Sequence, residues 1–184
     1  MKEFFVDIEN TLIDDLYSCN LLEAQTKQIG QFIHNRCVLE RIQGNPPVKV
    51  NLFTWGWKTK DEIRDYVVNW LFEAMEVPVE NRGTVWTKDD SIECAYRHGW
   101  INTKDEMQIE DLHVPGAMKR FGLDKQQCFV QQVMDLCEFP SPTGLDCEYT
   151  LIDDTNDDRW QETRELIVAN NRRLTIMLLH PKLR

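Results

Sequence analysis

Five short apolar runs recur along the chain, and polar or amphipathic segments separate them. This alternation constrains the fold more than any other feature. The runs are short and rich in β-branched or aromatic residues, which is typical of buried strands in a parallel sheet covered on both faces. They lie at residues 4–6, 48–54, 83–87, 148–154 and 174–181.

The intervening segments contain helical patterns. The clearest spans 62–76, where seven apolar side chains recur at the spacing of one helix face. We also expect helices over 20–42, 106–114 and 158–171. Strands that alternate with helices predict an α/β fold, in which a doubly wound, mainly parallel, Rossmann-like sheet carries helices on both faces.

A chain of 184 residues is long enough for one substantial core, and no linker divides it. We therefore expect a single domain over residues 1–184. The stretch 87–118 is longer than one crossover requires, so we interpret it as a small insertion or flap.

Charge and cysteine content limit the partners and the compartment. The net charge of −10 argues against nucleic acid or an anionic membrane as a partner, but it leaves room for a nucleotide-sized ligand. The first apolar stretch is too short for a signal peptide, and no window is long enough to span a bilayer. The six cysteines form no C-x-x-C pair, so we expect reduced, mostly buried thiols in a cytoplasmic protein. The oligomeric state stays open.

Three of the predicted strands end in oxygen-bearing side chains. Asp7 and Glu9 follow the first run, Thr54 ends the second, and the pair 153–154 (Asp-Asp) ends the fourth. Ligands bind at the carboxyl ends of parallel strands, so adjacent strands would bring these groups together. Crowded carboxylates raise each other's pKa unless a cation offsets them. An oxygen-only site suits Mg²⁺, which prefers a few carboxylates together with phosphate oxygens.

These residues resemble the haloacid dehalogenase superfamily. That family has an apolar strand followed by Asp-x-Asp-x-Thr, and this chain has Asp7-x-Glu9-x-Thr11 in "VDIENTLID". A second strand ending in Thr or Ser matches "VNLFTWG" with Thr54, and a later strand followed by Asp-Asp matches "TLIDDTNDD". The order and approximate spacing agree over nearly the whole chain.

The family's third motif is a lysine at the start of the helix before the last of these strands. Lys125 in "GLDKQQCFVQQ" fits best, because it stands at a predicted helix start. Lys104 and Lys119 lie further upstream and are the alternatives.

The resemblance implies a phosphohydrolase that depends on Mg²⁺ and acts on an unidentified phosphomonoester: a nucleotide, a small metabolite or a macromolecular phosphate. Asp7 would be the nucleophile and form an aspartyl-phosphate, and Glu9 would be the general acid and base. Thr54 and Lys125 would bind the phosphoryl oxygens. The metal ligands would be Asp7, Asp154 and the carbonyl of Glu9, with Asp153 or Asp158 supporting the shell.

Glu9 departs from the family pattern, which has a second aspartate. The longer side chain must fold back to reach the same oxygen, and a displacement near 1 Å costs on the order of a hundredfold in rate. The alternative is therefore a binding or regulatory protein on the same fold, with slow or absent turnover.

Simpler interpretations remain for single residues. Asp7 can be a turn residue, Thr54 an ordinary strand residue, and Asp157 or Asp158 part of the first turn of a helix. Trp55 stands beside Thr54 and can stack on a nucleobase, or it can be a packing residue. About forty residues separate the first two motifs and are mostly one predicted helix, so we expect little or no cap domain and an open site.

Overall fold

The computed structural model describes residues 2–13, 36–44, 49–56, 60–61, 63, 65–102, 123–138, 146–156 and 158–182. Its strands are β1 (Lys2–Asp7), β2 (Lys49–Phe53), β3 (Arg82–Trp86), β4 (Cys147–Ile152), β5 (Glu162–Val168) and β6 (Arg172–Leu179). Its helices are α2 (Arg36–Gln43), α3 (Asp65–Ala74), α4 (Lys88–Arg97) and α7 (Lys125–Glu138), with short 3-10 turns η2 (Val79–Asn81) and η3 (Ala169–Asn171).

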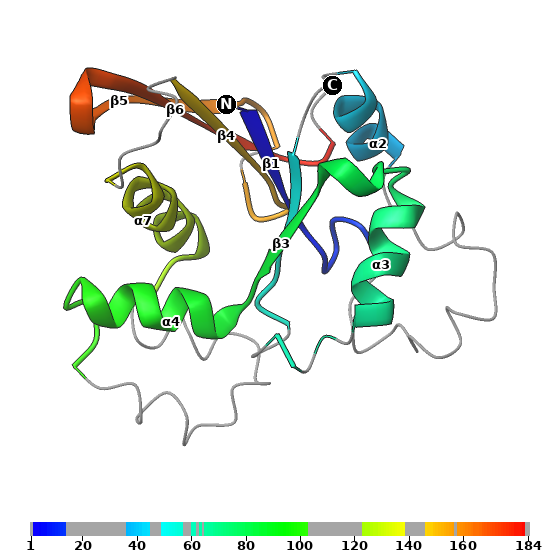
Figure 1. Ribbon diagram of the computed structural model, residues 1–184, viewed down its shortest axis with the longest axis horizontal. Helices are drawn as coiled ribbons and strands as arrows, with labels where there is room; N and C mark the ends of the chain where they lie inside the picture. The colour runs from blue at the N-terminus through cyan, green and yellow to red at the C-terminus, as the bar shows by residue number, and fades with distance from the viewer. Residues whose placement is uncertain are drawn as a thin grey trace.

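The six strands form one twisted sheet with the order β3-β2-β1-β4-β6-β5 (Figure 1). All neighbours are parallel except β5, which pairs antiparallel with β6 at the edge. The prediction of an α/β fold with a mainly parallel sheet is confirmed. Because β1 lies between β2 and β4, the carboxyl ends of these three strands are adjacent at the centre of the sheet.

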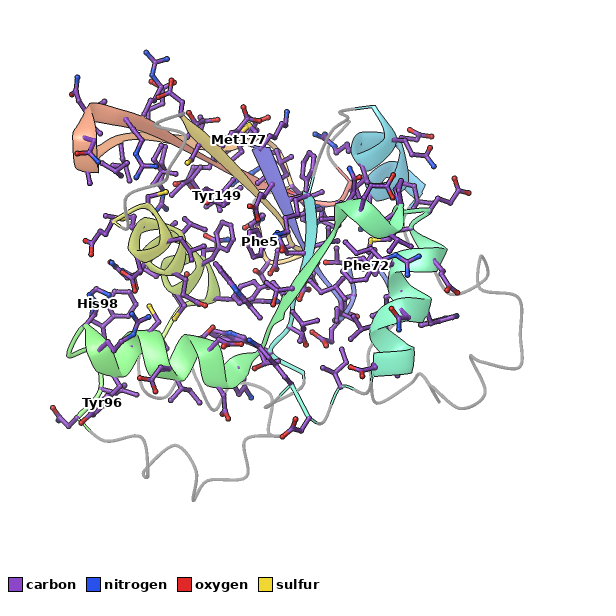
Figure 2. The ribbon with its side chains drawn as sticks, in the orientation of Figure 1. Phe5, Phe72, Tyr96, His98, Tyr149 and Met177 are labelled. Carbon is purple, nitrogen blue, oxygen red and sulfur yellow. The ribbon has the colours of Figure 1, made fainter. Side chains whose placement is uncertain are left out.

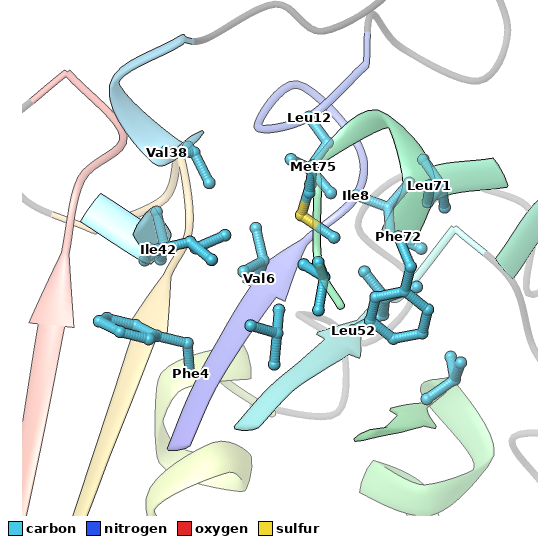
Figure 3. Packing of buried hydrophobic residues seen from close by; sticks show 14 of the residues in the cluster. Phe4, Val6, Ile8, Leu12, Val38, Ile42, Leu52, Leu71, Phe72 and Met75 are labelled. Atoms are coloured by element: carbon cyan, nitrogen blue, oxygen red, sulfur yellow. The ribbon is translucent and has the colours of Figure 1, made fainter. Parts of the chain in front are cut away.

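Helices cover both faces of the sheet. Successive side chains of a strand point to opposite faces, so a central strand packs against helices on both sides. Phe4 and Val6 of β1 pack in one cluster with residues of α2 and α3 (Figure 3). Phe5, the residue between them, packs on the other face against Phe129 of α7, with ring centroids 5.2 Å apart. The central strand is therefore apolar on both sides, which the run Phe4-Phe5-Val6 indicated.

One element differs from the sequence prediction. We expected a helix over 158–171, but β5 and β6 form an antiparallel hairpin there. Asn170 and Asn171 have φ angles of 62° and 57°, and asparagine accepts this left-handed conformation more readily than most residues. The exposure of β5 alternates along the strand, as expected at a sheet edge with one solvated face. The pair of asparagines was the signal for a hairpin.

The stretch 87–118 begins as a regular helix. Thr87 and Asp90 form a capping box at the start of α4, which packs against α7. Residues 103–118, with the helix expected over 106–114, lie outside the described residues, as does most of the helix expected over 20–42. Within the described ranges no separate cap domain is present.

The described residues bear on two expectations about the chain's surroundings. No helix in the described segments is long and apolar enough to cross a membrane. The thiols of Cys94, Cys128, Cys137 and Cys147 are buried, and none of the four forms a disulfide within the described residues.

Candidate functional site

The register of the sheet brings the ends of three strands to one level. Asp7 pairs with Phe53, and Val6 pairs with Ile152. The residues that follow these partners, Thr54 and Asp153, therefore lie on either side of Asp7. All three side chains are almost completely buried.

A lysine from a distant helix joins two of these strand ends. Helix α7 begins at Lys125, as the sequence predicted. The ammonium group donates a hydrogen bond to Asp7 Oδ1, and its Nζ lies 2.9 Å from Asp153 Oδ2. Nζ also lies 5.3 Å from the centre of the Phe53 ring, within the range of a cation–π interaction. Lys125 is thus held between two carboxylates and an aromatic ring.

Thr11 connects the loop after β1 to the loop after β4. Its hydroxyl donates to Asp7 Oδ2 at 3.2 Å and accepts the backbone N–H of Asp154 at 3.1 Å. The turn that presents Thr11 is tight, because the N–H groups of Leu12 and Ile13 both donate to the carbonyl of Ile8. A single hydroxyl therefore fixes the distance between the two acidic loops.

Thr155 and Asn156 hold Asp153 and the loop after β4 in place. The backbone N–H and the hydroxyl of Thr155 both donate to Asp153 Oδ1, at 2.8 and 2.5 Å. The side-chain amide of Asn156 donates to the carbonyls of Leu151 and Leu179, which ties the loop to β4 and β6. These contacts pre-organise the acidic loop before any ligand binds.

Glu9 folds back onto the end of β2. Thr54 Oγ1 donates to Glu9 Oε1 at 2.6 Å and accepts the N–H of Gly56 at 3.1 Å. The Glu9 carboxyl group is half-buried beside the cluster. Its extra methylene thus lets it reach the threonine hydroxyl.

The environment shifts the pKa values of the four carboxyl groups in different directions. Burial raises the pKa of Asp7 well above its usual value, although Lys125 opposes this shift. For Asp153, burial acts in the same direction, but Lys125 and the hydrogen bonds from Thr155 outweigh it and hold the pKa below its usual value. Burial and the charge of Asp153 raise the pKa of Asp154. Burial likewise raises the pKa of Glu9.

Lys125 stays charged in this setting. Burial alone would lower its pKa, but the charges of Asp153 and Asp7 outweigh that effect and raise the pKa above its usual value. Among the described residues, four carboxyl groups nevertheless surround the single ammonium group of Lys125, so this part of the cluster is short of positive charge.

The arrangement fits a hard divalent cation. Asp7, Asp153 and Asp154 each offer an oxygen, and the three oxygens lie within 4.8 Å of one another. Oxygen-only ligand sets of this kind suit Mg²⁺, and a bound cation would lower the pKa values of the carboxyl groups around it. The Glu9 carbonyl stays a predicted ligand.

The remaining candidates are Trp55, Asp158 and the two alternative lysines. Trp55 is half-buried; its Nε1 donates to Ser91 Oγ at 2.9 Å, and its ring packs beside Ile92. This anchoring favours the packing interpretation of Trp55. Asp158 is exposed. The alternative lysines, Lys104 and Lys119, lie outside the described residues.

Sequence reasoning missed the roles of Thr11, Thr155 and Asn156. The signal for Thr11 was its place in Asp7-x-Glu9-x-Thr11, where a hydroxyl four residues after an aspartate can reach back to it. Thr155 directly follows the Asp-Asp pair, and such hydroxyls commonly bond to a nearby turn. Only the packed fold reveals that Thr11 also reaches Asp154.

The chain matches no protein-family model, and no curated protein or solved structure is significantly similar to it. The fold and the geometry of the acidic cluster are therefore the basis for assigning a function.

Proposed function

We propose that the protein is a phosphohydrolase that depends on Mg²⁺, resembles the haloacid dehalogenase superfamily, and acts through an aspartyl-phosphate on Asp7. One observation carries this proposal: Asp7, Asp153 and Asp154 offer ligand oxygens within 4.8 Å of one another, and Lys125 contacts two of these residues. Three carboxylates beside one fixed ammonium group suit a magnesium ion and a phosphoryl group together.

In this mechanism Asp7 attacks phosphorus and the P–O bond to the leaving group breaks, so one hard step becomes two easier ones. Bound Mg²⁺ would neutralise charge on the phosphoryl oxygens. Lys125 would offset the same charge, and Thr11 and Thr155 keep the carboxylates in place. Water then attacks the acyl-phosphate and releases inorganic phosphate and free Asp7.

Glu9 is suited to the proton transfers of both steps. Its raised pKa favours the protonated form, which a general acid needs when the leaving oxygen departs. The resulting carboxylate then takes a proton from the attacking water. Thr54 would bind a phosphoryl oxygen once its hydroxyl turns away from Glu9.

The hydrogen bond from Thr54 to Glu9 supports a second candidate function. Thr54 donates to Glu9 at 2.6 Å, so the hydroxyl proposed for the phosphate is already engaged. If binding phosphate does not break this contact, the protein is a binding or regulatory protein that keeps the metal site and turns over slowly.

Hydrolysis of p-nitrophenyl phosphate with Mg²⁺ separates the two functions. We expect activity in the native chain, a loss on the order of a thousandfold or more in Asp7→Asn, and unchanged activity in Glu80→Gln. Glu80 is the control because it is an exposed acid on the short turn before β3 and is not one of the predicted site residues. Equal rates for the native chain and Asp7→Asn would overturn the enzyme proposal.

If the native chain shows no turnover, binding of inorganic phosphate with Mg²⁺ tests the second function. We then expect phosphate to bind to the native chain and not to Asp154→Asn. A screen of phosphorylated metabolites and nucleotides would identify the class of phosphomonoester.

A further inference from the structure

A second group of metal-ligating side chains lies away from the acidic cluster, between α4 and α7. Cys94 belongs to α4, His98 follows the last turn of that helix, and Asp135 belongs to α7. One ligand atom from each lies within 4.8 Å of the other two. Figure 2 shows His98 on the side of α4 that faces α7.

The helical spacing explains why Cys94 and His98 converge. Residues four apart lie on the same face of a helix, and the backbone N–H of His98 donates to the carbonyl of Cys94 at 3.1 Å. Because α4 packs against α7, this face meets Asp135. The sulfur, the imidazole and the carboxylate therefore approach from two separate helices.

The chemical types of the three ligands indicate which metal ions this group would bind. Thiolate, imidazole and carboxylate are the ligands that Zn²⁺ uses in proteins, whereas Mg²⁺ and Ca²⁺ take oxygen ligands. The acidic cluster and this group thus differ in the ion they would take. Neither site needs the other.

The distance between His98 and Asp135 is slightly shorter than the distance between two ligands of one ion. His98 Nε2 lies 2.9 Å from Asp135 Oδ1 and 3.1 Å from Oδ2. Tetrahedral zinc ligands are about 3.3–3.6 Å apart, given metal–ligand bonds of about 2.0–2.3 Å. A shift of a few tenths of an ångström would therefore replace the hydrogen bond by two bonds to one ion. His98 is exposed, so its side chain can make this shift.

The surroundings support coordination by three protein ligands and one water. Gln131 Nε2 donates to Asp135 Oδ1 at 3.0 Å, and Arg97 lies 3.0 Å from Oδ2, so the carboxylate is oriented by outer partners. Asp135 and Arg97 also line a pocket of about 230 Å³ that is open to solvent, although Cys94 and His98 do not line it. The exposed side chain of His98 leaves the group accessible to water.

We propose that Cys94, His98 and Asp135 form a zinc-type metal site that links α4 to α7. Binding would form Zn–S, Zn–N and Zn–O bonds, and the thiol proton of Cys94 would pass to solvent, so one proton is released for each ion. Because α7 begins at Lys125, the ion would also fix the helix that carries the lysine of the acidic cluster.

Cobalt titration of the full chain tests the proposal, since Co²⁺ is a spectroscopic substitute for Zn²⁺. After metal removal, we expect added Co²⁺ to give a thiolate-to-cobalt charge-transfer band, which Zn²⁺ then displaces. Cobalt bound only to the oxygen ligands of Asp7, Asp153 and Asp154 would give no such band. Asp7→Asn should therefore keep the band, which makes this test independent of the proposed phosphohydrolase activity.

Matched variants locate the site. Cys94→Ala should abolish the band, whereas Cys128→Ala, which removes a buried thiol on α7, should keep it. His98→Asn changes an exposed side chain and should weaken Zn²⁺ binding by more than the ~10–100-fold that the loss of an outer partner costs. Zn²⁺ should raise the thermal midpoint of the native chain and of Cys128→Ala, but not that of His98→Asn.

Two results would overturn the zinc proposal. One is the absence of a charge-transfer band in the native chain. The other is Zn²⁺ affinity in His98→Asn equal to that of the native chain, a comparison that holds even if Cys94→Ala fails to fold.

Discussion

The ammonium group of Lys125 donates a hydrogen bond to the carboxylate of Asp7, 118 residues earlier in the chain. This contact joins the start of α7 to the end of the central strand β1. It places Lys125 between Asp7 and Asp153, at the carboxyl edge of the sheet.

Replacing Lys125 by methionine should destabilise the fold. The substitution removes the cation and leaves buried carboxylates unpaired, which costs about 3–5 kcal/mol of unfolding free energy. Urea denaturation measures the loss, and Mg²⁺ should restore part of it by binding the same carboxylates. Lys49→Met, at an exposed position on β2, is the control and should change stability by about 0.5 kcal/mol or less. Equal losses in the two variants would contradict this role of Lys125.

Shortening Glu9 to aspartate should change turnover. Thr54 contacts Glu9 only because the longer side chain reaches it, so Glu9→Asp would free the Thr54 hydroxyl for phosphate. We expect kcat for p-nitrophenyl phosphate to rise by as much as about a hundredfold, whereas Glu9→Gln should lower it. A kcat for Glu9→Asp below that of the native chain would contradict the view that the longer side chain of Glu9 slows turnover.

Much of the site could be predicted because buried parallel strands have a simple sequence signature. Phe4-Phe5-Val6 and the run before Asp153 are apolar on both faces, so their ends and the acids that follow were visible without a structure. Lys125 was identified differently, as the third motif of the family resemblance at a predicted helix start, and α7 does begin there.

Apart from the asparagine pair between β5 and β6, the remainder depends on tertiary contacts. The segment of β5 has side chains compatible with either a helix or an edge strand, and pairing with β6 decides between them. The hydrogen bond from Asp154 to Thr11 joins residues 143 positions apart, so only the packed sheet reveals it.

Gly83 should not tolerate a side chain. A Cβ at this position would lie 2.0 Å from Asn51 Oδ1 and 2.8 Å from the carbonyl of Val50, beside the irregular pairing of β2 and β3. Gly83→Ala should therefore cost about 1–3 kcal/mol, measured by urea denaturation. Asn51 also accepts the N–H of Thr84 and donates to Glu3, so the polar contacts of three strands would shift.

Gly99→Ala provides the comparison for Gly83→Ala. A Cβ at Gly99 would meet open space, and its φ of 68° alone should cost about 1 kcal/mol. A smaller loss at Gly83 than at Gly99 would contradict the crowding argument.

The stability of the fold should fall in alkaline solution. Burial and the neighbouring Cys147 raise the pKa of the Cys137 thiol from 9.0 to about 11, and burial also raises the pKa of Tyr149. The unfolded chain therefore releases these protons first, so stability that is complete below pH 9 is lost as the pH rises toward 11. Urea denaturation between pH 8 and 11 measures the slope. Cys137→Ala should reduce that slope, and an unchanged slope would contradict the assignment.

The most direct test of the acidic cluster is anomalous diffraction from a crystal grown with Mn²⁺, an ion that takes the same oxygen ligands as Mg²⁺. We expect one peak about 2.1 Å from a carboxylate oxygen of Asp7 and from one of Asp154. A peak at other acidic residues, with none between Asp7 and Asp154, would contradict the central claim that these strand ends hold one metal ion.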